Sequence, residues 1–600
     1  MNQRLNIVIQ ELERGAFLKI HWRQFCKAKR RNALSRNVLK LNQKKVVLAQ
    51  AELVSLLSLW KEMPEKALAL MDELLLLNPF DAGVHSLKGI CLLGMPNDTG
   101  GLTHLGLAAG LNPNDQSCLE NFGKALKRAD PQVSLTFYKD WLEIASTNEG
   151  AVIGYADALL VIGDRLGALQ VLEEFCKKSI GHIEAKKRYA GLLIEKGCSE
   201  IAATVLNSVQ PKTAEVLDLL GRASQTSNQR HKAVAYYREA ACLPGSVKPG
   251  AWQLFTTCAS VSELDSAYPE ILSCFNESDP RSKARMSLGF ALGNVHIKNG
   301  RSESALKYYQ QANSYIAENF KQNMALWSDL EDKIDAGWFY SQLELQTKPR
   351  KVLSKPVFIV GSPRSGSSVL EERLSRHSNI QGLGELIVRK GKQTLAYQGD
   401  VLDLNFDTAT FLASYERELT FQGLNKPVFI DKQLFNVFHL GRLVRCFPNC
   451  LIIATRRDLY KVIWSCFRSY FDISQVGLHY TADVVQIAKT VKLMDRVIDT
   501  WMTLIPDNMM LVEHDDFCNE PISILENILS KLDLKWEPEM GCYSKQVTSC
   551  RTLSSLQVSE PVSNYRHQVL PEVVEEFITS QLQAHMLYDS RESHDSKRLL

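Results

Sequence analysis

The chain changes its pattern of hydrophobic and polar positions near residue 350. Before that point, the apolar stretches are short and are broken by recurring Gly, Pro and other small residues, which predicts a series of helices. After it, β-branched and aromatic runs alternate with helical stretches. Strands that alternate with helices predict a parallel sheet with helices on both faces, so we expect an all-α region followed by an α/β domain. The expected strands are residues 357–360, 427–430, 451–454 and 509–512.

Small residues recur with a period of 34 residues in the first half of the chain. The dipeptide Asn-Pro at 78–79 returns at 112–113, and Gly163 and Gly197 lie the same distance apart. These offsets match the tetratricopeptide pattern, in which each unit is a hairpin of two helices. We expect small residues to let the helices approach closely and aromatic residues to fill the gap to the next unit. The fuller units read Leu220-Gly221, Ala233, Tyr237, Ala240, Pro244 and Leu292-Gly293, Gly300, Ala305, Tyr309, Ala312.

A stack of such hairpins buries its apolar faces only between neighbours, so the stack itself is the fold. We expect five to seven repeats over residues 51–345 and a concave surface that binds a peptide or protein. A spacer or an arm for homodimer formation is the alternative. Residues 1–50 form a separate basic helical segment in this interpretation, because ten Lys and Arg but no Asp or Glu lie between Phe17 and Ala51. That segment could dock an acidic partner or a membrane surface, or it could be a solvated helix face.

Composition narrows the class of protein. Six hundred residues exceed what one core usually organises, and a net charge of +3 gives no field that favours a nucleic-acid partner. Fourteen cysteines without a CxxC pair, and histidines without an i, i+4 pair, predict reduced thiols and no metal site. Glu11 and Glu13 fall where a signal peptide needs an apolar core, and the apolar stretches are too short to span a membrane. We therefore expect a cytoplasmic protein without a transmembrane segment.

A Gly-rich turn follows the first expected strand of the second half. Residues 361–368 read GSPRSGSS and precede a helix that we expect to begin near Val369. Such a turn aims backbone N–H groups and the positive end of the helix at an anion. The spacing is that of a Walker loop, but Ser367 stands where the Walker lysine is required, and the loop carries Arg364 instead. A phosphate-like ligand is therefore favoured over ATP hydrolysis, and a turn without any ligand is the alternative.

Four segments of the second half occur in the order of the sulfotransferase motifs. The first, residues 358–386, contains the PRSGSS loop and a Gly-Glu pair, and the second, residues 429–436, contains an Asp-Lys pair. The third, residues 446–471, contains an Arg and a Ser eight residues apart, and the fourth, residues 551–562, contains the pattern Thr-x-Ser-x-x-Gln-Val. Over about residues 350 to 590 the chain thus resembles a sulfotransferase domain of the tyrosylprotein and bacterial repeat-fused type, and we expect that domain to span residues 350–600. The resemblance implies a P-loop-like α/β fold and transfer of a sulfuryl group from 3′-phosphoadenosine 5′-phosphosulfate to an acceptor hydroxyl, with no metal.

The resemblance also implies roles for individual residues. Glu385 is the catalytic base, Lys432 neutralises charge on the transferred group, and Arg364 acts on the same group. A carboxylate is a weak base for a hydroxyl, so Glu385 would need a partly desolvated site. The alternatives are that Glu385 is an ordinary surface acid and that Lys432 pairs with Asp431. The donor would be held by Arg364, Ser365, Gly366, Ser367 and Ser368 at the phosphosulfate, by Arg457 and Ser465 at the 3′-phosphate, and by Ser554 from the C-terminal side.

The sequence departs from the family pattern at several positions. Leu459 replaces a proline, His514 replaces a tyrosine that contacts adenine, and Arg566 is the one candidate for the basic loop at the 3′-phosphate. Asp458 is expected to be structural. These departures keep an alternative open, in which a repeat scaffold carries an inactive or nucleotide-sensing sulfotransferase domain. The acceptor stays open as well and could be a protein or peptide tyrosine, a carbohydrate or a small molecule.

Overall fold

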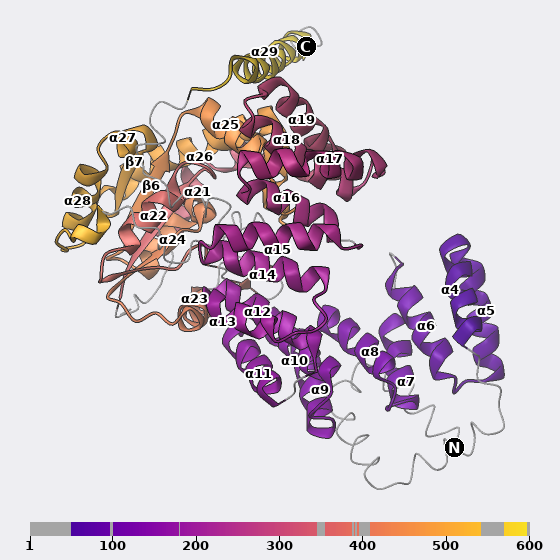
Figure 1. Ribbon diagram of the computed structural model, residues 1–600. Coiled ribbons are helices and arrows are strands. Elements are labelled where there is room, and N and C mark those ends of the chain that lie inside the picture. Colours follow the sequence, from indigo (N-terminus) through magenta and orange to yellow (C-terminus); the bar gives the residue numbers. More distant parts are fainter. Residues whose placement is uncertain are drawn as a thin grey trace. The chain divides into compact units, whose positions relative to one another are not determined.

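Packing divides the chain into two compact units, Met1–Tyr189 and Ala190–Leu600. The computed structural model describes residues 50–95, 100–178, 181–245, 247–344, 354–386, 389–390, 393–394, 408–541 and 569–596. The basic segment expected at residues 1–50 therefore lies, except for its last residue, outside the described part of the chain. Each unit is described by itself below (Figure 1).

The first unit is a succession of helices, as the period of small residues predicts. The Asn-Pro dipeptides lie at helix ends, because Asn78 and Asn112 each follow the last residue of a helix. Asp or Asn side chains accept backbone hydrogen bonds at several helix starts, for example Asp130 from Gln132 and Val133. The helices are α4 (Gln50–Glu62), α5 (Pro64–Leu77), α6 (Ala82–Leu93), α7 (Gly101–Leu111), α8 (Gln116–Ala129), α9 (Pro131–Ile144), α10 (Glu149–Val161), α11 (Arg165–Lys178) and the start of α12 (Ile183–Lys196).

The second unit begins with further helices of the same kind. Tyr237 packs against Gly221, where an added Cβ would lie 2.4 Å from the Tyr237 ring, and Tyr309 packs against Gly293 at the same 2.4 Å. The close approach expected at these glycines is thus confirmed. These helices are α13 (Ser199–Asn207), α14 (Ala214–Thr226), α15 (Arg230–Cys242), α16 (Lys248–Cys258), α17 (Val261–Glu277), α18 (Lys283–Lys298), α19 (Ser302–Asn319), α20 (Lys321–Met324), η1 (Ser328–Lys333) and α21 (Ala336–Leu343).

The glycines at 163, 197 and 300 have a different role from the one expected. Their φ angles are +85°, +85° and +73°, and nothing lies within 4 Å of an added Cβ at any of them. They sit in the short turns between successive helices, where a left-handed backbone suits glycine. The expectation that these three glycines bring helices into close contact is wrong, because it is the turn that requires them.

A five-stranded parallel sheet in the order β2-β5-β1-β6-β7 forms the centre of the second unit. The four expected strands and their parallel arrangement are confirmed. The three-residue edge strand β2, with the sequence IQG, was missed because it has no β-branched run. The strands are β1 (Lys355–Gly361), β2 (Ile380–Gly382), β5 (Val428–Asp431), β6 (Leu451–Arg456) and β7 (Met509–Glu513), and β3 (Arg389–Lys390) pairs separately with β4 (Gln393–Thr394).

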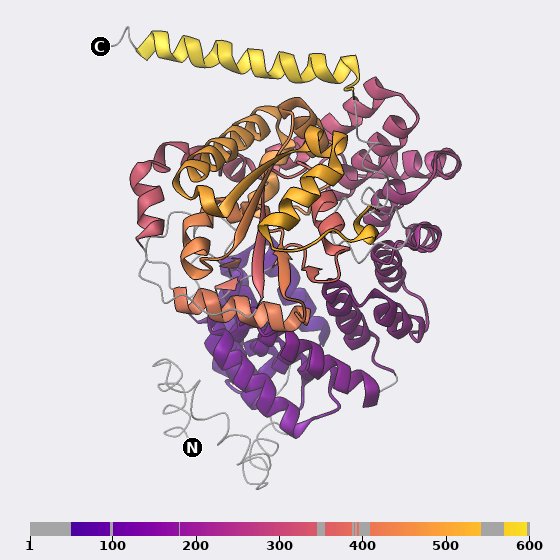
Figure 2. The ribbon, with the colours of Figure 1, turned by 90° about the vertical axis from the view of Figure 1, so that its left-hand side faces the viewer.

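Alternate residues of β1 face two different cores, so both faces of the sheet are covered (Figure 2). Val357 and Ile359 pack in one core, and Phe358 and Val360 pack in the other. The helices of this domain are α22 (Ser367–Ser375), α23 (Thr408–Gln422), η2 (Leu434–His439), α24 (Leu440–Cys446), α25 (Leu459–Phe467), η3 (Val476–Ala482), α26 (Val484–Leu504), η4 (Pro506–Asn508), α27 (His514–Asn519), α28 (Pro521–Lys531), η5 (Pro538–Met540) and α29 (Glu572–Ser596).

The core that contains Phe358 extends without a break into the preceding helices. It includes Phe290 of α18 and Tyr309 of α19, together with Trp327 between α20 and η1. The last hairpin of the helical region and the sheet therefore share one hydrophobic core within the second unit. Among the described helices, none is both long and apolar enough to cross a membrane.

Candidate active site

The Gly-rich turn connects β1 to α22 and is tightly enclosed. Gly361 has φ +138°, and an added Cβ there would lie 2.4 Å from the Thr455 carbonyl oxygen. Gly366 has φ +94°, and an added Cβ would lie 2.2 Å from Nδ1 of His514. Arg364 also adopts a positive φ, +71°, which is uncommon for a residue with a side chain. The turn thus runs between the ends of β6 and β7 and delivers the chain to the start of α22 at Ser367.

The hydroxyl of Ser365 faces inward, toward β6. Ser365 is 1% exposed, and its Oγ lies 2.7 Å from Oγ1 of Thr455. Thr455 also donates to the Val360 carbonyl at 3.2 Å. This hydroxyl pair fixes the turn to the neighbouring strand.

Arg364, Arg457 and Ser465 come together although about a hundred residues of chain separate the first from the last. Arg364 Nε donates to Oγ of Ser465 at 2.8 Å, and Arg457 Nη1 donates to the Arg364 carbonyl at 3.2 Å. Ser465 is buried in the last turns of α25. Burial lowers the pKa of Arg457 from its ordinary value. We call these three residues the arginine cluster, and two arginines held in one cluster make it a candidate site for a multivalent anion.

Glu385 and Lys432 form an ion pair at the end of β5. Lys432 Nζ lies 2.8 Å from Oε1 of Glu385; the lysine side chain is 1% exposed and the glutamate side chain is 47% exposed. The backbone brings them together, because the Lys432 N–H donates to the Gly384 carbonyl and the Gly384 N–H donates to the Glu371 carboxylate. The enclosed environment expected for Glu385 is not found, since the turn holds this residue at the surface.

Asp431 is a buried carboxylate whose role the sequence did not reveal. It is 1% exposed, and burial raises its pKa to about 6. The Tyr415 hydroxyl and the Asn436 amide donate to it at 2.9 and 3.1 Å, and the backbone N–H groups of Gln433 and Leu386 donate at 2.9 and 3.4 Å. Asp431 thereby ties the turn that carries Glu385 to the end of β5. Its place in an Asp-Lys pair suggested a partner for Lys432, but the structure pairs Lys432 with Glu385.

Three more residues singled out in the sequence have defined positions. Asp458 accepts the Lys461 N–H at 2.9 Å and caps α25, so its structural role is confirmed. Leu459 is the first residue of that helix. His514 is 5% exposed and begins α27; burial, with the charge of Arg457 beside it, lowers its pKa to about 4, so the ring is neutral at pH 7. Ser554 and Arg566 lie outside the described residues.

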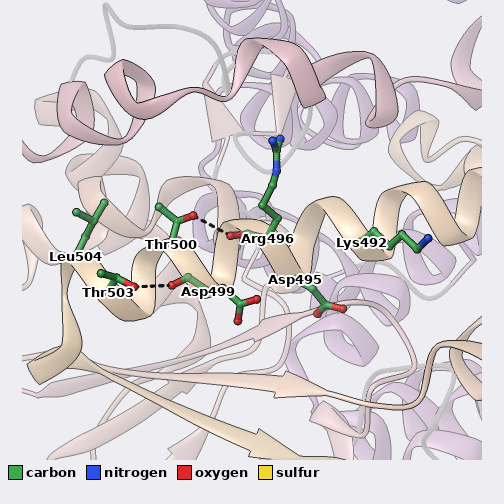
Figure 3. Close-up of a pocket in the computed structure, with 7 residues that line it drawn as sticks. All are labelled: Lys492, Asp495, Arg496, Asp499, Thr500, Thr503 and Leu504. Carbon is green, nitrogen blue, oxygen red and sulfur yellow. Dashed lines mark hydrogen bonds between the residues drawn. The ribbon is translucent and has the colours of Figure 1, made fainter. Parts of the chain in front are cut away.

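A shallow hollow runs along one side of α26 (Figure 3). None of the residues predicted for the active site lines it. Arg456, at the end of β6, forms ion pairs with Asp495 at 3.2 Å and Asp499 at 2.7 Å, which occupies the two carboxylates of this hollow. Its lining residues are Lys492, Asp495, Arg496, Asp499, Thr500, Thr503 and Leu504.

A parallel sheet whose first strand runs through a Gly-rich turn into a helix defines a P-loop-like α/β domain with its ligand site at the carboxyl ends of the strands. The turn, the arginine cluster and the Glu385–Lys432 pair all lie at that edge. Residues 356–538 match the model of the sulfotransferase family. This part of the chain is therefore similar to the sulfotransferase family.

Individual relatives are distant. An uncharacterized protein of Aquifex aeolicus (strain VF5) is 22% identical over 474 residues, which cover 72% of this chain and 60% of that protein. The chain thus matches less than two thirds of this relative. The crystal structure of sulfotransferase STF1 from Mycobacterium tuberculosis H37Rv aligns with a TM-score of 0.24 and 12% identity over 54% of this chain and 99% of that one. Sulfotransferase STF9 from Mycobacterium avium aligns with a TM-score of 0.24 and 14% identity over 46% and 85%.

Proposed function

We propose that the protein transfers the sulfuryl group of 3′-phosphoadenosine 5′-phosphosulfate to the hydroxyl of an acceptor. The observation that carries the proposal is the Glu385–Lys432 pair, 2.8 Å long, at the same sheet edge as the arginine cluster. A carboxylate and an ammonium side by side provide a proton acceptor and a charge for the transferred group. The match of residues 356–538 to the sulfotransferase family model supports the reaction class, and the donor is the one that the family resemblance implies.

The residues present fit the donor. Its phosphate and phosphosulfate groups carry several negative charges, and Arg364 and Arg457 supply two positive ones, with the Ser465 hydroxyl hydrogen-bonded to Arg364. The first turn of a helix also has N–H groups without an intrahelical partner, and here that turn begins at Ser367 and Ser368. His514 Nδ1 is buried beside Gly366 without a hydrogen-bond partner, so a polar atom faces the turn. We assign the turn to the phosphosulfate, and Arg457 with Ser465 to the 3′-phosphate.

The proposed reaction is a direct displacement. Glu385 takes the proton of the acceptor hydroxyl while the acceptor oxygen forms a bond to sulfur. The bond between sulfur and the bridging phosphate oxygen breaks, and its electron pair leaves with adenosine 3′,5′-bisphosphate. Lys432 and Arg364 stabilise the charge that moves onto the bridging oxygen, which is the electrostatic part of catalysis. Since Glu385 is half exposed, the bound acceptor would have to cover it before it becomes an effective base.

The helical region is proposed to bind the acceptor or a protein that carries it. Stacked hairpins present extended surfaces for such ligands. The acceptor class stays open between a protein or peptide tyrosine, a carbohydrate and a small molecule, as does formation of a homodimer.

Transfer of radiolabelled sulfate from the donor to a panel of acceptors tests the activity, and calorimetry with adenosine 3′,5′-bisphosphate tests donor binding separately. Glu385→Ala should abolish transfer and keep nucleotide binding. Glu303→Ala is the matched control, because it removes a Glu–Lys pair of the same 2.8 Å length on the surface of α19. Nucleotide binding without transfer to any acceptor would favour a nucleotide-sensing scaffold, and no binding at millimolar nucleotide would rule out the proposal.

A further inference from the structure

An asparagine of the helical region reaches into the active-site domain. Asn313 of α19 is 3% exposed, and its Nδ2 donates to the Phe467 carbonyl oxygen at 2.7 Å. Phe467 is the last residue of α25, the helix that carries Ser465. The carbonyl groups of a last helical turn have no partner within the helix, so a buried one needs a donor from elsewhere.

Aromatic contacts join the hairpin of α18 and α19 to α25 and to the segment that follows it. Tyr309 of α19 meets the Trp464 ring edge to face at 5.6 Å, and Phe290 of α18 meets the Tyr470 ring in the same way at 5.6 Å. Figure 1 shows α25 beside α18 and α19, and Tyr309 is completely buried at this contact. The C-terminal half of α25 is therefore packed against the helical region and is not supported by the sheet alone.

The hydrogen bond between Asn313 and Phe467 lies close to the proposed donor site. Ser465 is two residues before Phe467, and its Oγ receives the hydrogen bond from Arg364. In a helix of nine residues, loosening the last turn displaces Ser465 directly. The other half of the site does not depend on this helix, because Glu385 and Lys432 are held by β5 and by the turn that follows β2.

We propose that Asn313 is a positioning residue of the donor site. It fixes the end of α25 and so keeps Ser465 in place for Arg364 and the donor 3′-phosphate. The last hairpin of the helical region then supports the nucleotide-binding site, in addition to offering a surface for ligands. This inference rests on the proposed function, since it assumes that the arginine cluster binds the donor.

The test is calorimetry of adenosine 3′,5′-bisphosphate with the full chain and with Asn313→Ala. Removing a buried hydrogen bond of this kind is expected to weaken nucleotide binding by about tenfold. Gln225→Ala is the matched control, because Gln225 accepts the Tyr237 hydroxyl at 2.9 Å in the earlier hairpin of α14 and α15. The control should lose thermal stability without a change in nucleotide affinity.

Steady-state kinetics separate positioning from a general loss of structure. In Asn313→Ala the KM for the donor should rise by about the same factor as the dissociation constant. The turnover number at saturating donor should fall less than the affinity, because the Glu385–Lys432 pair is untouched and only the hydrogen-bond partner of Arg364 is displaced. Asn313→Gln, which keeps the amide donor, should recover part of the affinity. Should Asn313→Ala fail to fold, Asn313→Ser replaces it, since its hydroxyl is too short to reach Phe467.

The measurements distinguish a failure of the proposed function from a failure of the positioning role of Asn313. Wild-type protein that does not bind the nucleotide removes the proposed function, and this inference falls with it. Wild-type protein that binds while Asn313→Ala and Asn313→Ser bind equally well leaves the function standing and overturns the positioning role. Equal losses of affinity in Asn313→Ala and Gln225→Ala would also overturn it, because the effect would then be a general one.

Discussion

The two side chains of the Glu385–Lys432 pair are unequally buried, so removing one should change the stability of the protein more than removing the other. Lys432 is 1% exposed and Glu385 is 47% exposed. Lys432→Met takes away the buried ammonium and leaves a carboxylate that water reaches. Glu385→Ala instead takes the carboxylate from an ammonium that stays buried, although Lys432 has further interactions. Loss of transfer is expected from both variants, but loss of stability is expected mainly from the second.

The magnitudes follow from desolvation. Replacing a buried charge with an apolar side chain of similar size is often neutral, so Lys432→Met should change the free energy of unfolding by about 1 kcal/mol or less. Leaving a buried charge without a partner costs several kcal/mol in a fully enclosed pair. Lys432 keeps its further interactions in Glu385→Ala, and the open side of the pair admits water, so we expect a smaller loss of about 1–3 kcal/mol. The rate of transfer should fall by about a hundredfold or more in either case.

Urea titration followed by fluorescence measures the two free energies, and the radiolabel assay measures transfer. The exposed pair of Glu303 and Lys307 is the control, since its side chains are 71% and 66% exposed and its bond is also 2.8 Å long. Glu303→Ala and Lys307→Met should both change stability by less than about 0.5 kcal/mol. A larger loss of stability in Lys432→Met than in Glu385→Ala would refute the argument from burial.

Two further predictions concern the backbone and the pH dependence. Gly366→Ala should abolish nucleotide binding in calorimetry, because the added Cβ would lie 2.2 Å from His514 Nδ1. Gly384→Ala is the control and should keep binding, because Gly384 also has a positive φ, +68°, but nothing lies within 4 Å of an added Cβ there. Nucleotide binding by Gly366→Ala would contradict the tight enclosure of the turn. Burial raises the pKa of Asp431 from 3.8 to about 6. Between these two values the folded state holds a proton that the unfolded state releases. The free energy of unfolding should therefore fall as the pH rises from about 4 to about 6, and it should then level off. The difference in unfolding free energy between the wild type and Asp431→Asn should change by about 3 kcal/mol across that window, and a flat difference in urea titrations would contradict the raised pKa.

The local elements could be predicted from the sequence. The β-branched runs at residues 357–360 and 451–454 became β1 and β6, since a strand buried on both faces reads as a continuous apolar run. The Gly-Tyr offsets predicted the close contacts of Tyr237 with Gly221 and of Tyr309 with Gly293. The short edge strand β2 escaped prediction, because three residues carry no period.

Part of the candidate site could also be predicted, because residue type and spacing carry chemistry. Arg364, Arg457 and Ser465 were expected to hold one ligand, and the structure brings them into direct contact. Lys432 was expected either to neutralise charge on the transferred group or to pair with Asp431. Its contact with Glu385 was not predicted, because 47 residues of chain separate the two. The backbone bond from Lys432 to Gly384 places Glu385 beside the lysine, while Asp431 is buried among donors of its own.

By itself, then, the order of residues determines periodicity, turns and the kinds of side chain that each element offers. It does not determine which distant elements share a core, because that depends on how side chains of many elements fill one volume. Asn313 shows the difference: in the sequence it is an ordinary polar residue of a helix, and only the packing of α19 against α25 turns its amide into the partner of the Phe467 carbonyl. The same packing decides that the last hairpin and the sheet form a single body, since neither could bury its apolar face alone.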